Sequence, residues 1–151
     1  MHSTFLVFRW GIKIYWIVTV LIKMFLIFYS FGKKWKLTKP FLIFLVFSTC
    51  YHGFSLTSLY RKCQRYEGPS LLVIESQNQE TFGAFLSCVP HVCAEFTGTG
   101  ESWLFSFKHD DRLQIYNWKG ENNYFFKGNL ASMVIGSGTL NSFECVKESL
   151  F

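Results

Sequence analysis

Strand-like runs that follow one another at hairpin spacing are the feature that most constrains this fold. They pair off as residues 71–75 with 81–87, 101–107 with 112–118, and 124–127 with 130–135. The connections are short: residues 76–80, where Asn78 can take a positive φ, residues 108–111, and the two-residue hairpin signal Gly128-Asn129. No helical run separates these strands, so the pattern predicts a mainly β (α+β) fold, an antiparallel two-sheet sandwich with one or two peripheral helices.

A strand and a helix are predicted ahead of these hairpins. Residues 42–47 are a short apolar run typical of a buried strand. Ser55 is a suitable N-cap, and the residues after it place one apolar stripe at helical spacing: Leu56, Leu59, Tyr60 and Cys63. Gly68-Pro69 is expected to end this helix.

Two sequence blocks in the second half of the chain carry a specific signature. They read FTGTGESWLFSF over residues 96–107 and YNWKGENNYFFKGNL over residues 116–130, and a Gly-Ser-Gly follows at 136–138. These blocks resemble the signature of the TLDc domain, the module of eukaryotic oxidation-resistance proteins. The matching signature residues are Gly98, Thr99, Gly100, Glu101, Leu104, Phe105, Trp118, Gly120, Asn122, Phe125, Lys127, Gly128, Leu130 and Ser132.

The resemblance extends upstream through HGFSLTSLYR and covers residues 41–138. A family member would normally continue after Gly138 through several closing strands, whereas this chain continues as TLNSFECVKESLF. We therefore expect a sandwich that is incomplete at the C-terminal end, with residues 130–135 partly uncovered unless residues 144–151 fold back over them. Where the family commonly has two aspartates, this chain has Asn129 and Ala131.

Charge divides the chain at Lys39. Residues 1–39 hold seven Lys or Arg and no acid, and residues 40–151 hold eight basic and ten acidic residues, so the net +5 is +7 from the first part and −2 from the rest. The basic charges lie inside an apolar stretch and form no polar face, which argues against nucleic-acid binding. We thus predict three parts: a basic apolar segment at 1–39, a partial TLDc-like domain at 40–138, and a divergent tail at 139–151.

Residues 14–31 are almost wholly apolar and long enough to cross a bilayer as one helix. Lys23 near the middle makes such a span marginal, and the lysines at 33–39 would leave the rest of the chain in the cytosol. A cleaved signal peptide is disfavoured because no small-x-small site follows. The equally weighted alternative is that residues 1–39 are a gene-model artefact, translated from AT-rich non-coding DNA.

The Gly98 to Glu101 turn has two interpretations. A phosphate-binding loop is disfavoured because no Lys-Ser/Thr follows and the next element is a strand. The favoured interpretation is structural: Gly98 and Gly100 permit a tight bend, with positive φ expected at Gly100, and Glu101 bonds backbone donors or a basic partner. The family resemblance brings no established catalytic role for this glutamate.

Cysteine and histidine residues are the remaining candidates for chemistry. The five cysteines are odd in number and no glycosylation sequon is present, which favours reduced thiols. Cys88, His91 and Cys93 provide only three ligands, so a metal site is disfavoured. Cys63 is expected to be a core residue, and His52 and His109 are read as ordinary turn residues.

The resemblance implies a non-catalytic protein without metal or cofactor, with a role in oxidative-stress resistance. It also implies contact with the cytosolic V1 sector of the vacuolar proton-pumping ATPase. The expected location is the cytoplasm, and the expected partner is a protein; membrane contact is expected only if residues 14–31 insert. Two alternatives stay open: a thiol-based antioxidant enzyme using Cys88 or Cys93, and a membrane-anchored adaptor.

Overall fold

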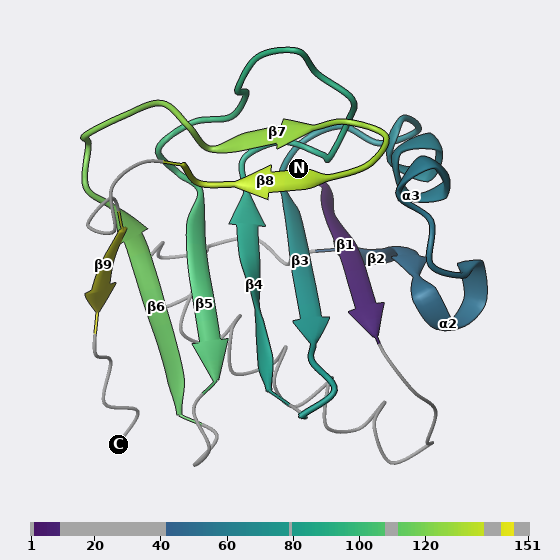
Figure 1. The fold of residues 1–151 in the computed structure, drawn as a ribbon, viewed down its shortest axis with the longest axis horizontal. Coiled ribbons are helices and arrows are strands. Elements are labelled where there is room, and N and C mark those ends of the chain that lie inside the picture. The colour runs from purple at the N-terminus through teal and green to yellow at the C-terminus, as the bar shows by residue number, and fades with distance from the viewer. Residues whose placement is uncertain (1, 10–41, 79, 108–111, 138–142, 147–151) are drawn as a thin grey trace.

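Four consecutive strands form an antiparallel meander at the centre of the molecule (Figure 1). They are β3 (Ser70–Glu75), β4 (Thr81–Leu86), β5 (Trp103–Phe107) and β6 (Leu113–Trp118). This computed structural model describes residues 2–9, 42–78, 80–107, 112–137 and 143–146. The first two predicted hairpins are therefore confirmed, although the predicted 108–111 turn lies outside the described residues.

Three further strands extend the meander to seven, in the order β2-β1-β3-β4-β5-β6-β9. Strand β1 (His2–Arg9) lies between β2 (Leu42–Ser48) and β3 and runs parallel to both, which the sequence pattern did not predict. Strand β9 (Phe143–Val146) pairs antiparallel with β6. These four residues of the tail thus cover β6, whereas the prediction placed any such cover over residues 130–135.

A second, two-stranded sheet crosses in front of one end of the large sheet (Figure 1). It consists of β7 (Phe126–Gly128) and β8 (Met133–Ile135), paired antiparallel. The predicted Gly128-Asn129 turn is wrong, because the chain reverses over residues 129–132. There the Asn129 Oδ1 accepts hydrogen bonds from the N–H groups of Ala131 and Ser132, both at 2.8 Å, and β8 begins three residues later than expected.

Two short helices, α2 (Thr49–His52) and α3 (Leu56–Cys63), connect β2 to β3. The predicted cap of α3 is confirmed, since the Ser55 Oγ accepts a 3.2 Å hydrogen bond from the Ser58 N–H. The helix ends at Cys63, before the predicted Gly68-Pro69 stop. Within the described residues no helix is long and apolar enough to cross a membrane, and the predicted span at 14–31 lies outside them.

Alternation along the strands divides the large sheet into two faces. On one face, neighbouring strands place buried aromatic rings next to one another: Phe85 stacks on Trp103 at 5.4 Å, and Trp103 contacts Phe105 at 5.9 Å. Leu113 and Ile115 on β6 lie on the same face and are also buried. Buried residues thus alternate with half-buried ones along β5 and at the start of β6, as expected for strands whose two faces differ in burial.

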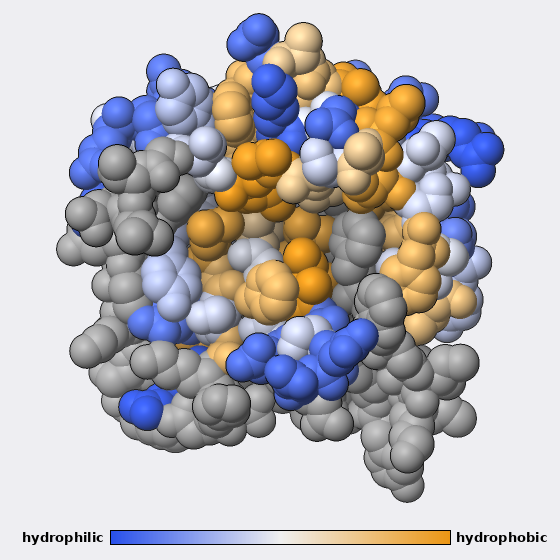
Figure 2. Space-filling view, viewed as in Figure 1, coloured by the Kyte–Doolittle hydropathy of each residue, from blue (hydrophilic) through white to orange (hydrophobic). Residues whose placement is uncertain are grey.

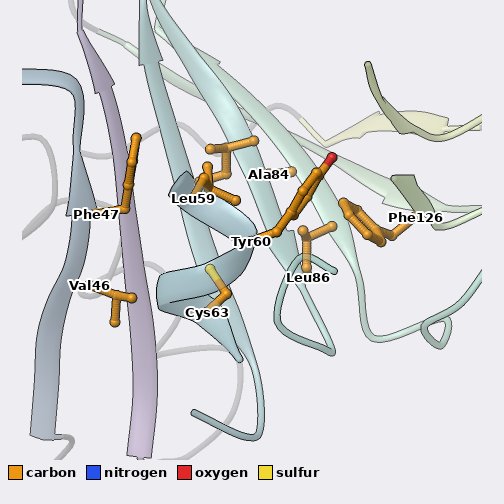
Figure 3. Close-up of a cluster of buried hydrophobic side chains, with 9 residues drawn as sticks. Val46, Phe47, Leu59, Tyr60, Cys63, Ala84, Leu86 and Phe126 are labelled. Carbon is orange, nitrogen blue, oxygen red and sulfur yellow. The ribbon is translucent and has the colours of Figure 1, made fainter. Parts of the chain in front are cut away.

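The opposite face carries the main core cluster, onto which α3 and the β7–β8 hairpin pack (Figure 3). The helix contributes Leu59, Tyr60 and Cys63, and the hairpin contributes Phe126, which has no exposed surface. The sheet contributes smaller side chains at the centre, Leu72, Ala84 and Leu86. The predicted apolar stripe of the helix is confirmed, and Cys63 is a core residue.

Beyond the hairpin, this second face of the sheet stays partly open. Figure 2 shows hydrophobic side chains gathered below the β7–β8 hairpin. Phe82 on β4 is 41% exposed, and Ile74, its register partner on β3, is half-buried. On the hairpin itself, Met133 and Ile135 are half-buried against the core cluster, while Leu130 is 66% exposed.

Candidate functional site

The Gly98 to Glu101 turn is fixed by the hydroxyl groups of two serines. The Ser87 Oγ accepts a 2.7 Å hydrogen bond from the Thr99 N–H and a 3.3 Å bond from the Ser102 hydroxyl. The Ser102 Oγ in turn accepts from the Ser87 N–H at 3.1 Å, and the Ser102 N–H donates to the Thr99 carbonyl. The turn is therefore anchored to the end of β4 before β5 begins.

Gly98 and Gly100 serve the turn in different ways. Gly98 has φ +107°, and a β-carbon there would lie 3.0 Å from the Phe125 Cβ. Gly100 is not among the glycines with positive φ, so the predicted backbone reason is wrong. The reason is contact, because a β-carbon at Gly100 would overlap the indole ring of Trp118. Both glycines thus allow the first signature block to lie against the second.

The second signature block supplies the aromatic side of this contact. Trp118 meets the buried Phe125 edge to face, with ring centroids 5.2 Å apart. Its indole Nε1 is buried and has no hydrogen-bond partner in the described part of the chain, so packing holds the ring. Gly120 has φ +88° with open space around it, and the Asn122 Oδ1 accepts a 3.0 Å bond from the Tyr124 N–H. These two residues shape the turn between the blocks.

Lys127 and Gly128 connect the signature to the core. The Lys127 ammonium lies 5.7 Å from the centroid of the Phe96 ring, which also contacts Tyr124 at 4.9 Å. Gly128 is buried, and a β-carbon there would overlap the His91 carbonyl oxygen. Tyr124, which the sequence placed in a core strand, precedes β7 and is 47% exposed, because the strand begins at Phe126.

Glu101 differs from the rest of the signature. Its backbone N–H donates to the Thr99 Oγ1 at 3.4 Å, but its side chain is exposed. Within the described residues the carboxylate makes no hydrogen bond or ion pair. A fixed backbone therefore presents an unpaired negative charge to solvent, and the predicted bonding of Glu101 to buried backbone donors is absent from this part of the structure.

The cysteines lie on the core side of the same region. The Cys93 Sγ accepts a 3.3 Å hydrogen bond from the Gly128 N–H, and the Cys88 Sγ lies 4.0 Å from the Thr97 Oγ1. Burial raises the pKa of the Cys88 thiol, and it raises that of Cys63 to about 12. Burial, followed by the nearby Cys93 and Cys63, also raises the pKa of Tyr60, whose hydroxyl donates to the Ser132 carbonyl.

In the described part of the chain, the ring nitrogens of the histidines bond backbone groups and not a cysteine. The His52 Nδ1 accepts a 3.1 Å bond from the Ser48 N–H, and the His91 Nδ1 lies 2.9 Å from the Val89 carbonyl oxygen. His109 lies outside the described residues. Among the residues that are described, no group of three or more His, Cys, Asp or Glu side chains is placed to hold a metal ion.

This joining of the two signature blocks agrees with a match between the chain and a protein-family model. The model of the TLDc domain matches residues 24–150, most of the chain and a wider range than the resemblance at 41–138. The chain belongs to the TLDc domain family. The fold and the two packed blocks described above are therefore those of a TLDc domain in this chain.

Curated relatives with a TLDc-like region include the human nuclear receptor coactivator 7, which is 37% identical over 94 residues. The oxidation resistance protein 1 of Xenopus laevis is 42% identical over 94 residues, and the human protein of that name is 37% identical over the same length. Each alignment covers 62% of this chain. The aligned part is only 10–11% of each relative, so the TLDc chain corresponds to a small part of those proteins.

Sequence reasoning missed the residues that hold the TLDc signature in place. Ser87 and Ser102 were not among the signature residues predicted from the sequence, yet their hydroxyls fix the Gly98 to Glu101 turn. In the sequence they are single serines on either side of the turn, with no pattern of their own. A small hydroxyl residue beside a glycine-rich turn is therefore a reasonable candidate for such an anchor.

Proposed function

We propose that this TLDc chain is a non-catalytic protein-binding domain with a role in resistance to oxidative stress. The names of its oxidation-resistance relatives support the stress role. The geometry of the signature supports the binding role, because Gly98, Gly100 and Trp118 are used to pack two loops together. Among the side chains that these loops expose to solvent is the Glu101 carboxylate.

The exposed Glu101 is the observation that carries this proposal. Hydrogen bonds to Ser87 and Thr99 fix the loop, so little backbone order is lost when a partner binds. An exposed carboxylate on a fixed backbone suits a basic group, and an arginine of a partner would pair with it in two hydrogen bonds. The proposed contact is therefore between the Glu101 carboxylate and a basic group of another protein.

For the partner, we extend the proposal to the cytosolic V1 sector of the vacuolar proton-pumping ATPase, as the family resemblance implies. The domain would then act in the cytoplasm. A charge pair at the edge of an interface mainly changes the association rate and its dependence on salt. Binding through Glu101 should accordingly weaken as ionic strength rises.

The test measures binding of the purified full chain to purified V1 sector by interferometry at two salt concentrations. Glu101→Gln should weaken binding and Glu101→Lys should weaken it further, on the order of tenfold or more, because the second change reverses the charge. Glu67→Lys is the matched control, since Glu67 is an exposed acid in the segment after α3. Equal binding by the Glu101 and Glu67 variants would exclude Glu101 as the contact.

A second arm separates the partner from the broader role. Cells that lack their own TLDc proteins would be complemented with wild-type chain or Glu101→Lys and challenged with peroxide. Rescue by the wild type without measurable V1 binding would reject V1 as the partner but keep the stress role. Failure of the wild type to rescue would reject the stress role itself.

The structure also bears on the thiol-enzyme alternative. A peroxide-reducing thiol reacts as the thiolate, but burial raises the pKa of Cys88 and holds the buried Cys63 as a neutral thiol. A thiol-reactivity profile at neutral pH decides the matter. Rapid labelling of Cys88 or Cys93, together with catalytic turnover of peroxide, would favour the enzyme over the binding domain.

A further inference from the structure

The short strand β7 is bonded along both of its edges. One edge pairs with β8. Along the other, the Thr97 N–H donates to the Phe126 carbonyl at 2.7 Å and the Phe126 N–H donates to the Thr97 carbonyl at 3.0 Å. The Cys93 N–H donates to the Gly128 carbonyl at 2.9 Å, and the Gly128 N–H donates to the Cys93 Sγ at 3.3 Å. Residues 93–97 therefore cover the second edge of β7.

Two sulfur atoms lie along that covered edge. The Cys93 Sγ bonds the Gly128 N–H, and the Cys88 Sγ lies 4.0 Å from the Thr97 Oγ1, which donates to the Phe126 carbonyl at 3.4 Å. Phe126 and Gly128 are two residues apart on a strand, a step of roughly 6.6 Å. Both cysteines also pack against the same core cluster.

The chain between the two cysteines is held at its centre and reaches solvent near its end. Pro90 is fully buried, and the His91 ring nitrogen Nδ1 lies 2.9 Å from the Val89 carbonyl oxygen. The next residue, Val92, is 53% exposed, so this segment borders solvent. The two half-buried sulfurs thus lie along one edge of β7, at the two ends of a short segment that a small oxidant can approach.

We propose that Cys88 and Cys93 form an oxidisable dithiol, which a hydroperoxide converts into an intramolecular disulfide. The Cys93 thiolate attacks the peroxide oxygen, so the O–O bond breaks, an alcohol or water leaves, and Cys93 becomes a sulfenic acid. The Cys88 sulfur then displaces water and forms the S–S bond. Two thiols and one hydroperoxide give one disulfide, one alcohol or water, and one further water.

The surroundings of the sulfurs set this order of events. Burial raises the pKa of Cys88, which suits the thiol that reacts second, within the protein. Cys63 is fully buried and has a pKa of about 12, so it stays a thiol. Cys50 is exposed on α2 and is not part of the cluster at β7, so it would react separately.

The disulfide would change the contact with β7. A sulfur shared in an S–S bond is a poorer acceptor than a thiol that faces Gly128, and closing the bond draws Cys93 toward Cys88. The Gly128 N–H then loses its partner, and the edge of the hairpin that carries Lys127 and Gly128 is loosened. Oxidation would therefore act on the signature block through its backbone, independently of whether V1 is the partner.

The test uses the full chain carrying Cys50→Ser, treated with hydrogen peroxide, then alkylated and mapped by mass spectrometry. The expected product is a peptide that contains Cys88 and Cys93, has lost two hydrogens and takes up no alkylating agent. Amide exchange at Gly128 should rise on oxidation and return on reduction. Cys88→Ser should stop at an oxidised Cys93 without the disulfide, and Cys93→Ser should leave Cys88 reduced.

Several results would overturn the proposal. They are a disulfide that joins Cys88 or Cys93 to Cys63 or Cys145, oxidation of Cys88 while Cys93 stays reduced, and formation of the disulfide with no change in exchange at Gly128. Serine keeps the size and an acceptor atom at each position, and the melting midpoint of each variant shows whether it is folded. The Cys50→Ser chain keeps both Cys88 and Cys93, so it shows whether the disulfide forms even if a serine variant at either position is unfolded.

Discussion

Gly100 lies directly against the indole of Trp118, so close that a β-carbon at position 100 would overlap the ring. The two residues come from different signature blocks and meet where β5 begins and β6 ends. The glycine is therefore required by a contact between distant parts of the chain.

Gly100→Val should destabilise the domain by about 1–3 kcal/mol, because the added side chain must displace Trp118 from its packing on Phe125. Chemical denaturation followed by fluorescence measures the change. In a Trp118→Leu background the same substitution should cost clearly less, since the obstacle is gone. Equal costs in the two backgrounds would show that Trp118 is not the reason for the glycine.

Asn129→Ala should lower the free energy of unfolding by about 1 kcal/mol. The Asn129 Oδ1 accepts bonds from the N–H groups of Ala131 and Ser132, and its Nδ2 donates to the Ser132 Oγ at 2.9 Å. Asn129→Asp keeps both acceptor contacts and restores the residue typical of the family, so it should cost less than alanine. Thermal unfolding of the wild type and the two variants measures the costs. A larger loss of stability for Asn129→Asp than for Asn129→Ala would contradict this account.

Stability should fall as pH rises above 9 because of Cys63. Its pKa is raised from 9.0 to about 12 in the folded chain, so the unfolded chain releases this proton first. The contribution is fully present below pH 9 and is lost as pH rises toward 12, with a slope of at most about 1.4 kcal/mol per pH unit. Denaturant unfolding at several pH values measures it, and Cys63→Ala, as the control, should lose this part of the slope.

If residues 14–31 form a membrane span, the protein made in cells should stay in the membrane pellet after alkaline carbonate washing. The apolar length of the segment is the reason for this expectation. Its TLDc part should then be open to a cytosolic protease, since the lysines at 33–39 favour the inside orientation. Recovery in the carbonate supernatant would reject the anchor.

Local pattern was enough to predict β3 to β6 and α3, because the short connections between the strands, the apolar stripe of the helix and the Ser55 cap are encoded within a few residues. Strand β1 was not predicted, since an apolar run at the start of the chain does not show which strands will receive it. The turn after β7 was misplaced because the Asn129 side chain replaces the backbone bonds of a tight hairpin. The role of Gly100 depends on Trp118, a contact that sequence spacing cannot give.

The place of β1 has a consequence for how the sheet is assembled. In the strand register, Leu6 of β1 pairs with Phe47 of β2 on one side and with Leu72 of β3 on the other. The strands β2 and β3, which are closer to each other in sequence, must therefore leave room for β1 between them. That gap is two strand spacings, about 9.5 Å wide. Pairing between strands so distant along the chain forms slowly, and until β1 enters, the edges of β2 and β3 are open to each other and to other chains. The folding rate of this domain should therefore depend on how quickly β1 pairs with β2 and β3.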